Sequence, residues 1–199
     1  METSEVLDLL RESDALLEGH FELSSGLHSN RYFQCALGLC DPKRAEIFAN
    51  GLAAKLPYEV DLVVGPALGA VVWAQEVARA LGKPAFFTER KDGQMLLRRG
   101  FSIEPGTKVL VVEDVITTGG SAREVVDLLQ ELGAEVCGVG TLVNRSGGNP
   151  YQDLGMELIA LAMVEVVTWE KGGCPLCAEG TDLTKPGSKT VLISGGGAG

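Results

Sequence analysis

The chain has 199 residues with 27 acidic and 17 basic side chains, which gives a formal net charge of −10. Such an acidic surface repels nucleic acids and anionic membranes, so non-specific binding to either is disfavoured. The length suits one large domain, and a hydrophobic content of 45% is enough to form a buried core. No apolar run approaches the roughly 18 residues of a membrane span, and the start lacks the pattern of a signal peptide. Five cysteines do not suggest a disulfide framework, so we expect a cytoplasmic protein that binds neither nucleic acid nor membranes.

The first part of the chain is expected to form two helices separated by a small polar segment. Apolar residues at helical spacing predict a helix over residues 4–18, with Ser4 as its N-cap. Residues 19–34 are polar and aromatic, and predict one or two short strands around turns. A second helix is expected to begin after Asp41, at Pro42, and to run towards Leu56, because proline is favoured in a first helical turn.

The middle of the chain alternates between aliphatic runs and amphipathic segments. The aliphatic runs predict strands over residues 61–64, 84–88, 108–112, 136–143 and 156–167. Two amphipathic segments predict helices, one ending at Gly82 and one over residues 121–133 with Gly133 at its C-terminus. This alternation predicts an α/β fold with a mainly parallel sheet flanked by helices. Ligands bind at the carboxyl ends of such strands, where the sequence places Gly65, Glu89, Glu113 and Asn144.

We expect one domain over residues 1–199. Within it, residues 1–50 form the N-terminal helix and a small hood, and residues 51–168 form the α/β core. Residues 169–199 form a C-terminal appendage that ends in a loose tail after Lys185.

Residues 109–124, VLVVEDVITTGGSARE, contain the pattern that is most informative about function. Glu113 and Asp114 follow an aliphatic strand, and carboxylates there can accept hydrogen bonds from the hydroxyls of a ribose or bind a divalent metal. Residues 117–121 then supply backbone N–H groups, hydroxyls and two glycines at the start of a helix, which suits a phosphate. A strand that simply ends in solvated acids before a turn is the alternative interpretation. A sugar site and a phosphate site three residues apart fit one ligand, a ribose 5-phosphate.

Two common phosphate-binding motifs do not occur in this chain. The pattern G-x-x-x-x-G-K-[ST] is absent, and Val143 occupies the place of the third glycine after Gly138 and Gly140. The phosphate loop is therefore neither that of an ATPase nor that of a dinucleotide-binding enzyme.

The segment VLVVEDVITTGGSA resembles the phosphoribosyl-diphosphate-binding signature of the type I phosphoribosyltransferases. Within that group the chain most resembles the orotate phosphoribosyltransferase family, through FELSSGLHSNRYF, VVGPALGAVV and LVNRSGG. These segments span most of residues 19–148. The resemblance implies the type I fold, with the N-terminal segment as the hood. It also implies a homodimer and a magnesium-dependent displacement of diphosphate by a pyrimidine base.

By this resemblance, the sugar substrate is bound by two loops. Glu113 and Asp114 contact the ribose hydroxyls, and Asp114 also belongs to the catalytic set. The 5-phosphate is held by Thr117, Thr118, Gly119, Gly120 and Ser121. The diphosphate lies on the turn containing Ala67, Leu68 and Gly69, where many relatives carry a lysine and backbone N–H groups must serve here.

The resemblance places orotate against Arg145, Thr117, Tyr32 and Phe33. The planar guanidinium of Arg145 suits the carboxylate of orotate, and the alternative is a surface salt bridge. The two aromatic residues line the base pocket or, alternatively, only pack a strand against a helix. Ser24 replaces a lysine that contacts orotate in many relatives, which puts that contact in doubt.

Residues 89–94 match the mobile catalytic loop of the family, although the histidine of the best-known members is missing. Arg90 and Lys91 are expected to neutralise the diphosphate of the neighbouring subunit's site, whereas Arg98 and Arg99 can be structural. Magnesium is expected to bind through the diphosphate, and no residue is assigned as a direct metal ligand.

The remaining candidates are histidines and cysteines. Cys174 and Cys177 form a C-x-x-C, which is half of a zinc site or a redox pair. No second C-x-x-C exists, so we expect a tight structural turn rather than a metal site. His20 and His28 have no evident catalytic partner and are expected to be structural or exposed.

The sequence therefore predicts an enzyme that makes orotidine 5-phosphate and diphosphate from orotate and phosphoribosyl diphosphate, in pyrimidine biosynthesis. Two alternatives stay open. One is a phosphoribosyltransferase for another nucleobase, and the other is a regulator that senses phosphoribosyl diphosphate without turnover.

Overall fold

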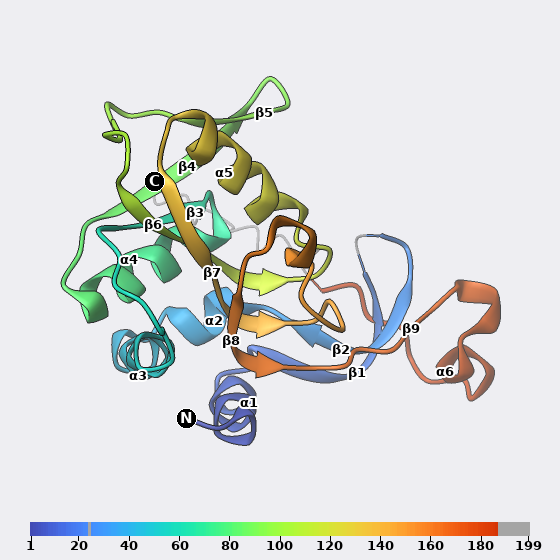
Figure 1. The fold of residues 1–199 in the computed structure, drawn as a ribbon. Helices are drawn as coiled ribbons and strands as arrows, with labels where there is room; N and C mark the ends of the chain where they lie inside the picture. Colours follow the sequence, from blue (N-terminus) through green and yellow to red (C-terminus); the bar gives the residue numbers. More distant parts are fainter. Residues whose placement is uncertain (24, 187–199) are drawn as a thin grey trace, which may run out of the picture. The chain divides into compact units, whose positions relative to one another are not determined.

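The computed structural model describes residues 1–23 and 25–186. The chain divides into two compact units, the first comprising Met1–Leu16 and Phe33–Glu165, and the second Leu17–Tyr32 and Val166–Gly199. Figure 1 shows the course of the chain through both units. The tail expected after Lys185 lies almost wholly outside the described residues.

A six-stranded sheet forms the centre of the first unit, with the strand order β5-β4-β3-β6-β7-β8 (Figure 1). Neighbouring strands are parallel, except that β5 runs antiparallel to β4. The mainly parallel sheet predicted from the sequence is therefore confirmed. The strands are β3 (Leu62–Pro66), β4 (Ala85–Lys91), β5 (Gln94–Leu97), β6 (Lys108–Ile116), β7 (Glu135–Asn144) and β8 (Leu158–Met163).

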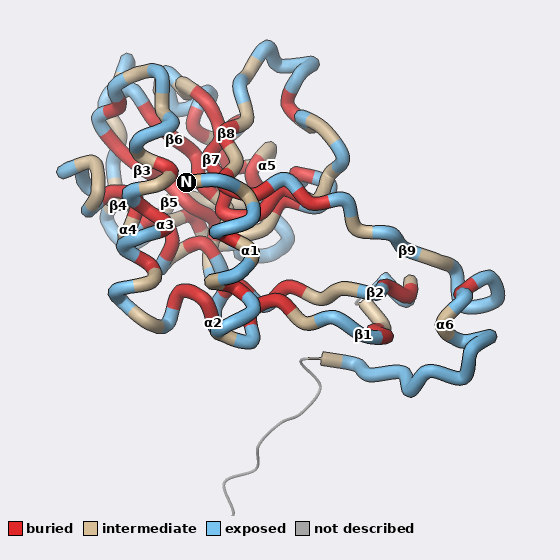
Figure 2. Tube along the Cα trace, turned by 90° about the horizontal axis from the view of Figure 1, so that it is seen from below, coloured by how far each residue is buried: buried red, intermediate tan, exposed pale blue. Residues whose placement is uncertain are grey.

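Helices pack on both faces of this sheet because its strands are apolar on both sides. The helices of the first unit are α1 (Thr3–Glu12), α2 (Cys35–Leu39), α3 (Pro42–Ala53), α4 (Gly69–Leu81) and α5 (Gly120–Glu131), with a short η1 (Gln152–Leu154). Val109 and Val111 of β6 share a buried cluster with α5. On the other face, a Cβ atom on Gly140 would touch Leu110, Val112 and Leu52 of α3. Figure 2 shows that burial is concentrated in these strands.

The first helix ends six residues earlier than the sequence pattern predicts. α1 stops at Glu12, where the Ser13 hydroxyl donates hydrogen bonds to the carbonyl groups of Leu9 and Leu10. Asp14 then takes a φ of 54°, which turns the chain out of the helix. The N-cap is Glu2, in a reciprocal capping box with Glu5, and not Ser4 as predicted.

Three other predicted helix ends are confirmed. The Asp41 side chain accepts a hydrogen bond from the backbone N–H of Lys43 at the start of α3, which ends at Ala53 rather than Leu56. Gly82 after α4 and Gly133 after α5 have φ values of 65° and 85°, as glycine residues that end helices often do. Helix α2 was not predicted, because five residues are too few to show a helical period.

The second unit is built on a three-stranded sheet with the order β1-β2-β9. The strands are β1 (Leu16–Glu22), β2 (His28–Phe33) and β9 (Thr168–Trp169), followed by η2 (Lys171–Gly173) and α6 (Pro175–Ala178). The one or two strands expected within residues 19–34 are found as two, although β1 begins at Leu16, within the range predicted as a helix. The strand expected over residues 156–167 is shorter than predicted: β8 spans only Leu158–Met163. From Thr168 the chain pairs with β2 in the three-stranded sheet.

No helix in the described part of the chain combines the length and apolar character needed to cross a bilayer.

Candidate active site

Glu113 and Asp114 lie within strand β6, which continues to Ile116 instead of ending at Val112 as predicted. Both residues are partly buried. Their side chains turn in opposite directions, one towards α5 and the other towards α4. The strand therefore brings its two adjacent acids to two different helix N-termini.

The Glu113 carboxylate contacts the start of α5. It accepts hydrogen bonds from the backbone N–H of Ala122 and from the hydroxyl of Ser121. Burial, and secondly the charge of Asp114, raises the pKa of Glu113 to about 7, and the two hydrogen bonds offset part of this rise. Near neutral pH this carboxyl group is therefore partly protonated.

The Asp114 carboxylate lies against the first residue of α4. A Cβ atom on Gly69 would be 2.9 Å from Asp114 Oδ1, so any larger residue in this position would have to displace the carboxylate. Burial also raises the pKa of Asp114, and this rise is opposed by hydrogen bonds from the backbone N–H groups of Val115 and Asp114 itself. The main chain of Asp114 is held from the side of β7, where the Thr141 hydroxyl donates to its carbonyl oxygen at 3.4 Å.

The predicted phosphate loop connects β6 to α5. Thr117 and Thr118 are exposed, and Gly119 has a φ of 79° just before the helix. A Cβ atom on Gly119 would lie 2.8 Å from Pro150 Cγ, and the buried Tyr151 donates a hydrogen bond from its hydroxyl to the Gly119 carbonyl oxygen at 3.2 Å. Open hydroxyls and N–H groups at the N-terminus of a twelve-residue helix provide the donors that a phosphate needs. Sequence reasoning missed Tyr151, because nothing in its local sequence indicates that it supports this loop.

The turn expected to hold diphosphate connects β3 to α4. The Ala67–Leu68 peptide bond is cis, and the backbone N–H of Ala67 donates to the carbonyl oxygen of Thr88 on β4. The Leu68 side chain is 88% exposed, so it does not fill a core position. Through Gly69, this turn lies beside Asp114.

Arg145 follows β7, and its backbone lies beside the start of the predicted phosphate loop between β6 and α5. Its backbone N–H donates to the Ile116 carbonyl oxygen at 2.8 Å, which ties it to the end of β6. Its guanidinium lies over the ring of the buried Phe33, 5.5 Å from the ring centroid. Next to it, Asn144 accepts hydrogen bonds from Ser146, so the turn that carries Arg145 is tightly bonded.

Tyr32 precedes Phe33 in β2 but belongs to the second unit. Its ring centroid lies 6.0 Å from that of Phe21. Ser24, the other position discussed for orotate, lies outside the described residues.

Residues 89–94, predicted as a mobile loop, lie in the β4–β5 hairpin. Lys91 pairs with Gln94, and the intervening Asp92 and Gly93 have φ values of 52° and 82°. Two positive φ values are typical of a type I′ turn, for which Asp-Gly is a favoured sequence. The Asp92-Gly93 pair is thus the local sequence signal for this hairpin turn.

The cations of the hairpin divide into two groups. Arg90 Nη1 lies 2.7 Å from Glu124 Oε2 on α5, and the same atom donates to the Gly93 carbonyl oxygen. Lys91 is exposed at the end of β4. Arg98 and Arg99 both pair with Glu89, at 3.6 and 2.7 Å, which supports a structural role for this pair.

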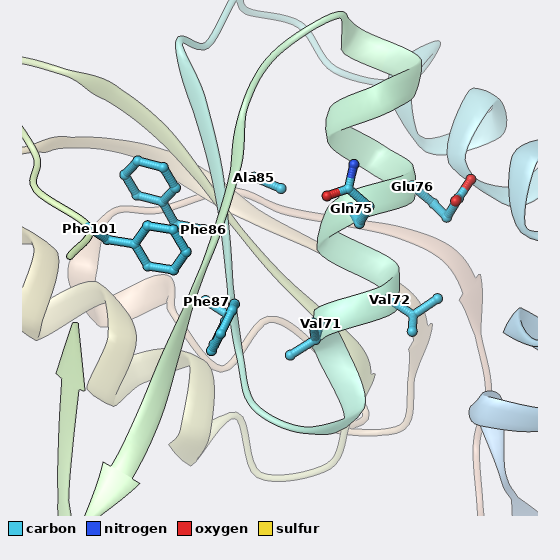
Figure 3. A pocket seen from close by; sticks show the side chains of 8 residues that line it. All are labelled: Val71, Val72, Gln75, Glu76, Ala85, Phe86, Phe87 and Phe101. Carbon is cyan, nitrogen blue, oxygen red and sulfur yellow. The ribbon is translucent and has the colours of Figure 1, made fainter. Parts of the chain in front are cut away.

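A separate hollow of about 400 Å³ is lined by residues of α4, β4 and the segment after β5 (Figure 3). Apolar side chains such as Val71, Phe87 and Phe101 line it, together with Gln75 and Glu76. None of its lining residues belongs to the predicted substrate loops.

Comparisons with known proteins agree with this geometry. The family described as the phosphoribosyl transferase domain matches residues 43–153, more than half of the chain. The chain belongs to the phosphoribosyltransferase family. The matched range contains both loops, Asp114 and Arg145, whereas Tyr32 and Phe33 precede it.

Several relatives of this phosphoribosyltransferase are orotate phosphoribosyltransferases. An orotate phosphoribosyltransferase of Carboxydothermus hydrogenoformans is 55% identical over 184 residues, covering 91% of this chain and 95% of that protein. One of Heliobacterium modesticaldum is 51% identical, covering 96% and 100%. Among solved structures, the orotate phosphoribosyltransferase of Aeropyrum pernix has a TM-score of 0.70 and 26% identity, covering 80% of this chain and 93% of that one. The enzyme of Mycobacterium tuberculosis in complex with inorganic phosphate has a TM-score of 0.65 and 26% identity, covering 81% and 95%.

Proposed function

We propose that this protein is an orotate phosphoribosyltransferase. It transfers the ribose 5-phosphate group from phosphoribosyl diphosphate to orotate, and yields orotidine 5-phosphate and diphosphate on the route to UMP. Relatives with that name are about half identical over nearly the whole chain. The observation that carries the proposal is the position of Arg145, whose backbone is bonded to Ile116 directly before the phosphate loop. A cation for the carboxylate of orotate thus lies beside the loop for the sugar phosphate.

The sugar substrate is proposed to bind across the two loops beside β6. Thr117, Thr118, Gly119, Gly120 and Ser121 hold the 5-phosphate through N–H groups and hydroxyls. Glu113 and Asp114 accept hydrogen bonds from the ribose hydroxyls. The diphosphate lies on the turn of Ala67, Leu68 and Gly69, which Gly69 places beside Asp114.

Orotate is proposed to bind between Arg145 and Thr117, with Phe33 beneath the guanidinium. The ring of Phe33 holds the guanidinium plane in position, so its N–H groups can pair with the orotate carboxylate in a bidentate manner. Tyr32 is proposed as a further contact to the base, on the ground of resemblance to the family.

Charge stabilisation is the main task of the site in the proposed reaction. The bond between ribose C1 and the diphosphate oxygen breaks, and a ring nitrogen of orotate bonds to C1 and loses its proton. Asp114 stands on the sugar side, where its negative charge favours the positive charge that develops on the ring. Arg90 and Lys91 are proposed to offset the charge of the leaving diphosphate, in the site of a neighbouring subunit.

Magnesium is proposed to bind through the diphosphate. Hard oxygen donors suit Mg²⁺, and the oxygens of the diphosphate provide them, so no side chain is assigned as a direct ligand. When bound, the ion supplies charge neutralisation of the leaving group. The proposal also includes a cytoplasmic location, which rests on composition, and a homodimer, which rests on resemblance to the family.

An assay of base specificity tests the proposal. Orotate consumption is followed spectrophotometrically with phosphoribosyl diphosphate and magnesium, and parallel reactions contain uracil, adenine, hypoxanthine or guanine. Turnover with orotate alone is expected. Turnover with a different base would assign another phosphoribosyltransferase activity, and binding of phosphoribosyl diphosphate without any turnover would assign a regulator.

A further inference from the structure

Four side chains with nitrogen or sulfur donors meet inside the second unit. His20 comes from β1, His28 from β2, and Cys174 and Cys177 from the segment around α6. One donor atom from each residue lies within 4.8 Å of all the others. His20, His28 and Cys174 are buried, whereas Cys177 is exposed. These residues are the only two histidines in the sequence and both cysteines of its single C-x-x-C.

The distances within this cluster are those of a tetrahedral metal site. With Zn–N bonds of about 2.0–2.1 Å and Zn–S bonds of about 2.3 Å, the nitrogen–sulfur edges of the tetrahedron are about 3.6 Å long. Here Cys174 Sγ lies 3.4 Å from His20 Nε2, and Cys177 Sγ lies 3.7 Å from the same atom and 3.3 Å from His28 Nδ1. The two ring nitrogens are 2.9 Å apart, slightly closer than the nitrogen–nitrogen edge of about 3.3 Å. A small outward movement of the rings accommodates an ion.

The hydrogen bonding of His20 fixes the tautomer that a metal requires. His20 Nδ1 lies 2.9 Å from the carbonyl oxygen of Thr181, which accepts only. The proton of a neutral His20 ring is therefore on Nδ1, and the lone pair of Nε2 points into the cluster. A backbone carbonyl bonded to the outer ring nitrogen is the usual support of a zinc-bound histidine.

We propose that His20, His28, Cys174 and Cys177 bind one zinc ion in a closed structural site. Two imidazole nitrogens and two thiolates are a common ligand set for structural zinc, and four protein ligands leave no position for a substrate. Binding places the ion between the two sulfur and two nitrogen atoms, and the two thiols lose their protons to solvent.

Such a site explains how the second unit is held together. Its two stretches together are shorter than the roughly 70 residues below which a domain rarely forms a sufficient core of its own. The ligands come from two strands near the N-terminus and from a segment about 150 positions later, as the sequence numbers show. An ion held by all four links these segments, where the buried hydrophobic residues among those described are Phe21 and Cys174.

This arrangement corrects the expectation that the C-x-x-C forms only a tight turn. That interpretation sought the missing ligands in a second pair of cysteines, whereas the structure supplies them from the two histidines. Both histidines are buried, so of the two expected alternatives the structural one holds and the exposed one does not.

Metal content and metal spectroscopy test the proposal on the full chain. Purified protein is dialysed against metal-free buffer and its zinc is measured by mass spectrometry, for the wild type, Cys174→Ser, Cys177→Ser and the control Cys137→Ser. Cys137 lies in β7 and outside the cluster. About one zinc per chain is expected in the wild type and in the control, with loss of at least tenfold in the other two.

A second measurement keeps the test decisive if the two cysteine variants fail to fold. Wild-type protein freed of metal with a chelator is titrated with Co²⁺. The intense visible absorption and the thiolate charge-transfer band of a tetrahedral site are expected at one equivalent, as is a rise in thermal midpoint when Zn²⁺ is restored. A weak octahedral spectrum, zinc content equal in Cys174→Ser and wild type, or a disulfide between Cys174 and Cys177 in freshly purified protein would overturn the proposal.

Discussion

The carboxylate of Asp114 lies so close to Gly69 that a single added methyl group would touch it, with a Cβ-to-Oδ1 distance of 2.9 Å. Residue 69 is the first residue of α4 and belongs to the turn proposed for diphosphate. The turn proposed to hold the diphosphate therefore lies directly beside a carboxylate proposed to contact the ribose.

Gly69→Ala is expected to displace the Asp114 carboxylate and to impair binding of phosphoribosyl diphosphate. A rise of about tenfold in the KM for this substrate corresponds to the loss of one or two hydrogen bonds, with a smaller change in the KM for orotate. Steady-state kinetics with each substrate varied in turn measures both constants. Gly148→Ala is the control, because its Cβ would enter open space; similar kinetic losses in both variants would contradict the prediction.

Glu113→Gln is expected to stabilise the protein without ligand at alkaline pH. Because the pKa of Glu113 is raised from 4.5 to about 7, the folded state holds this proton more tightly than the unfolded state. The free energy of unfolding therefore falls as pH rises from about 4.5 to 7, by at most about 3 kcal/mol, and stays reduced above that range. Glutamine keeps the acceptor oxygen and removes this cost.

Urea unfolding at pH 5 and at pH 8 measures the effect of Glu113→Gln. The advantage of the variant over the wild type should grow between these two pH values. It should be absent in the control Asp127→Asn, which changes an exposed residue of α5, the helix that Glu113 contacts. A difference that is the same at both pH values would argue against a raised pKa at Glu113.

Tyr151→Phe removes the hydroxyl that is bonded to the Gly119 carbonyl oxygen. We expect a rise of about two- to tenfold in the KM for phosphoribosyl diphosphate, because one hydrogen bond that supports the phosphate loop is lost. Tyr58→Phe is the matched control, since the buried Tyr58 hydroxyl makes no hydrogen bond within the described residues. The control should leave this KM unchanged and should keep or raise the thermal midpoint; an equal rise in KM for both would exclude a specific role of Tyr151.

Arg145→Ala is expected to lower kcat/KM for orotate by about 100-fold or more, because two charge-assisted hydrogen bonds to a carboxylate are lost. Dissociation of phosphoribosyl diphosphate, measured by calorimetry, should change much less. Arg145→Lys keeps the positive charge but loses the planar, bidentate guanidinium, so its kcat/KM for orotate should lie between those of the wild type and Arg145→Ala. Equal losses in the binding of both substrates would refute this assignment.

Arg90→Ala is expected to lower kcat by at least tenfold, while Arg99→Ala has a small effect. Both arginines are ion-paired in the hairpin, Arg90 with Glu124 and Arg99 with Glu89, but only Arg90 is proposed to reach the diphosphate. Single-turnover kinetics at saturating substrate separates chemistry from product release. If Arg99→Ala is as slow as Arg90→Ala, the effect belongs to hairpin stability and not to the leaving group.

The sequence was sufficient to predict the order of the core elements, because buried parallel strands and amphipathic helices leave strong local patterns. The strand before Glu113, the helix after Ser121 and the glycine after α4 all follow from residues close to each other in the chain. The start of the second helix at Asp41 and Pro42 was predictable for the same reason.

The predictions that were wrong concern elements in which a local sequence pattern continues across a turn. The helical spacing continues to residue 17, yet Ser13 and Asp14 end α1 because the serine hydroxyl bonds back to the helix and Asp14 takes a positive φ. Residues 89–94 were predicted to form a loop because they are charged. In the structure, Asp92 and Gly93 instead form a two-residue turn between the paired strands β4 and β5.

Contacts between distant segments could not be predicted from one sequence. His20 and Cys174 come together across 154 positions, and Tyr151 reaches Gly119 across 32. No fixed sequence separation predicts either contact. The opposite directions of Glu113 and Asp114 follow from the alternation of side chains along β6, but the helix that each carboxylate meets could not be predicted from the acidic pair itself.

The hydrogen bonds from Ser121 and Ala122 to Glu113 mean that the N-terminus of α5 already binds a carboxyl group of the protein itself. The phosphate group proposed to bind at Ser121 would compete with Glu113 for these two donors. Because Glu113 stays on β6 beside the loop, its partial protonation limits the negative charge that this ligand meets in a chain with a net charge of −10.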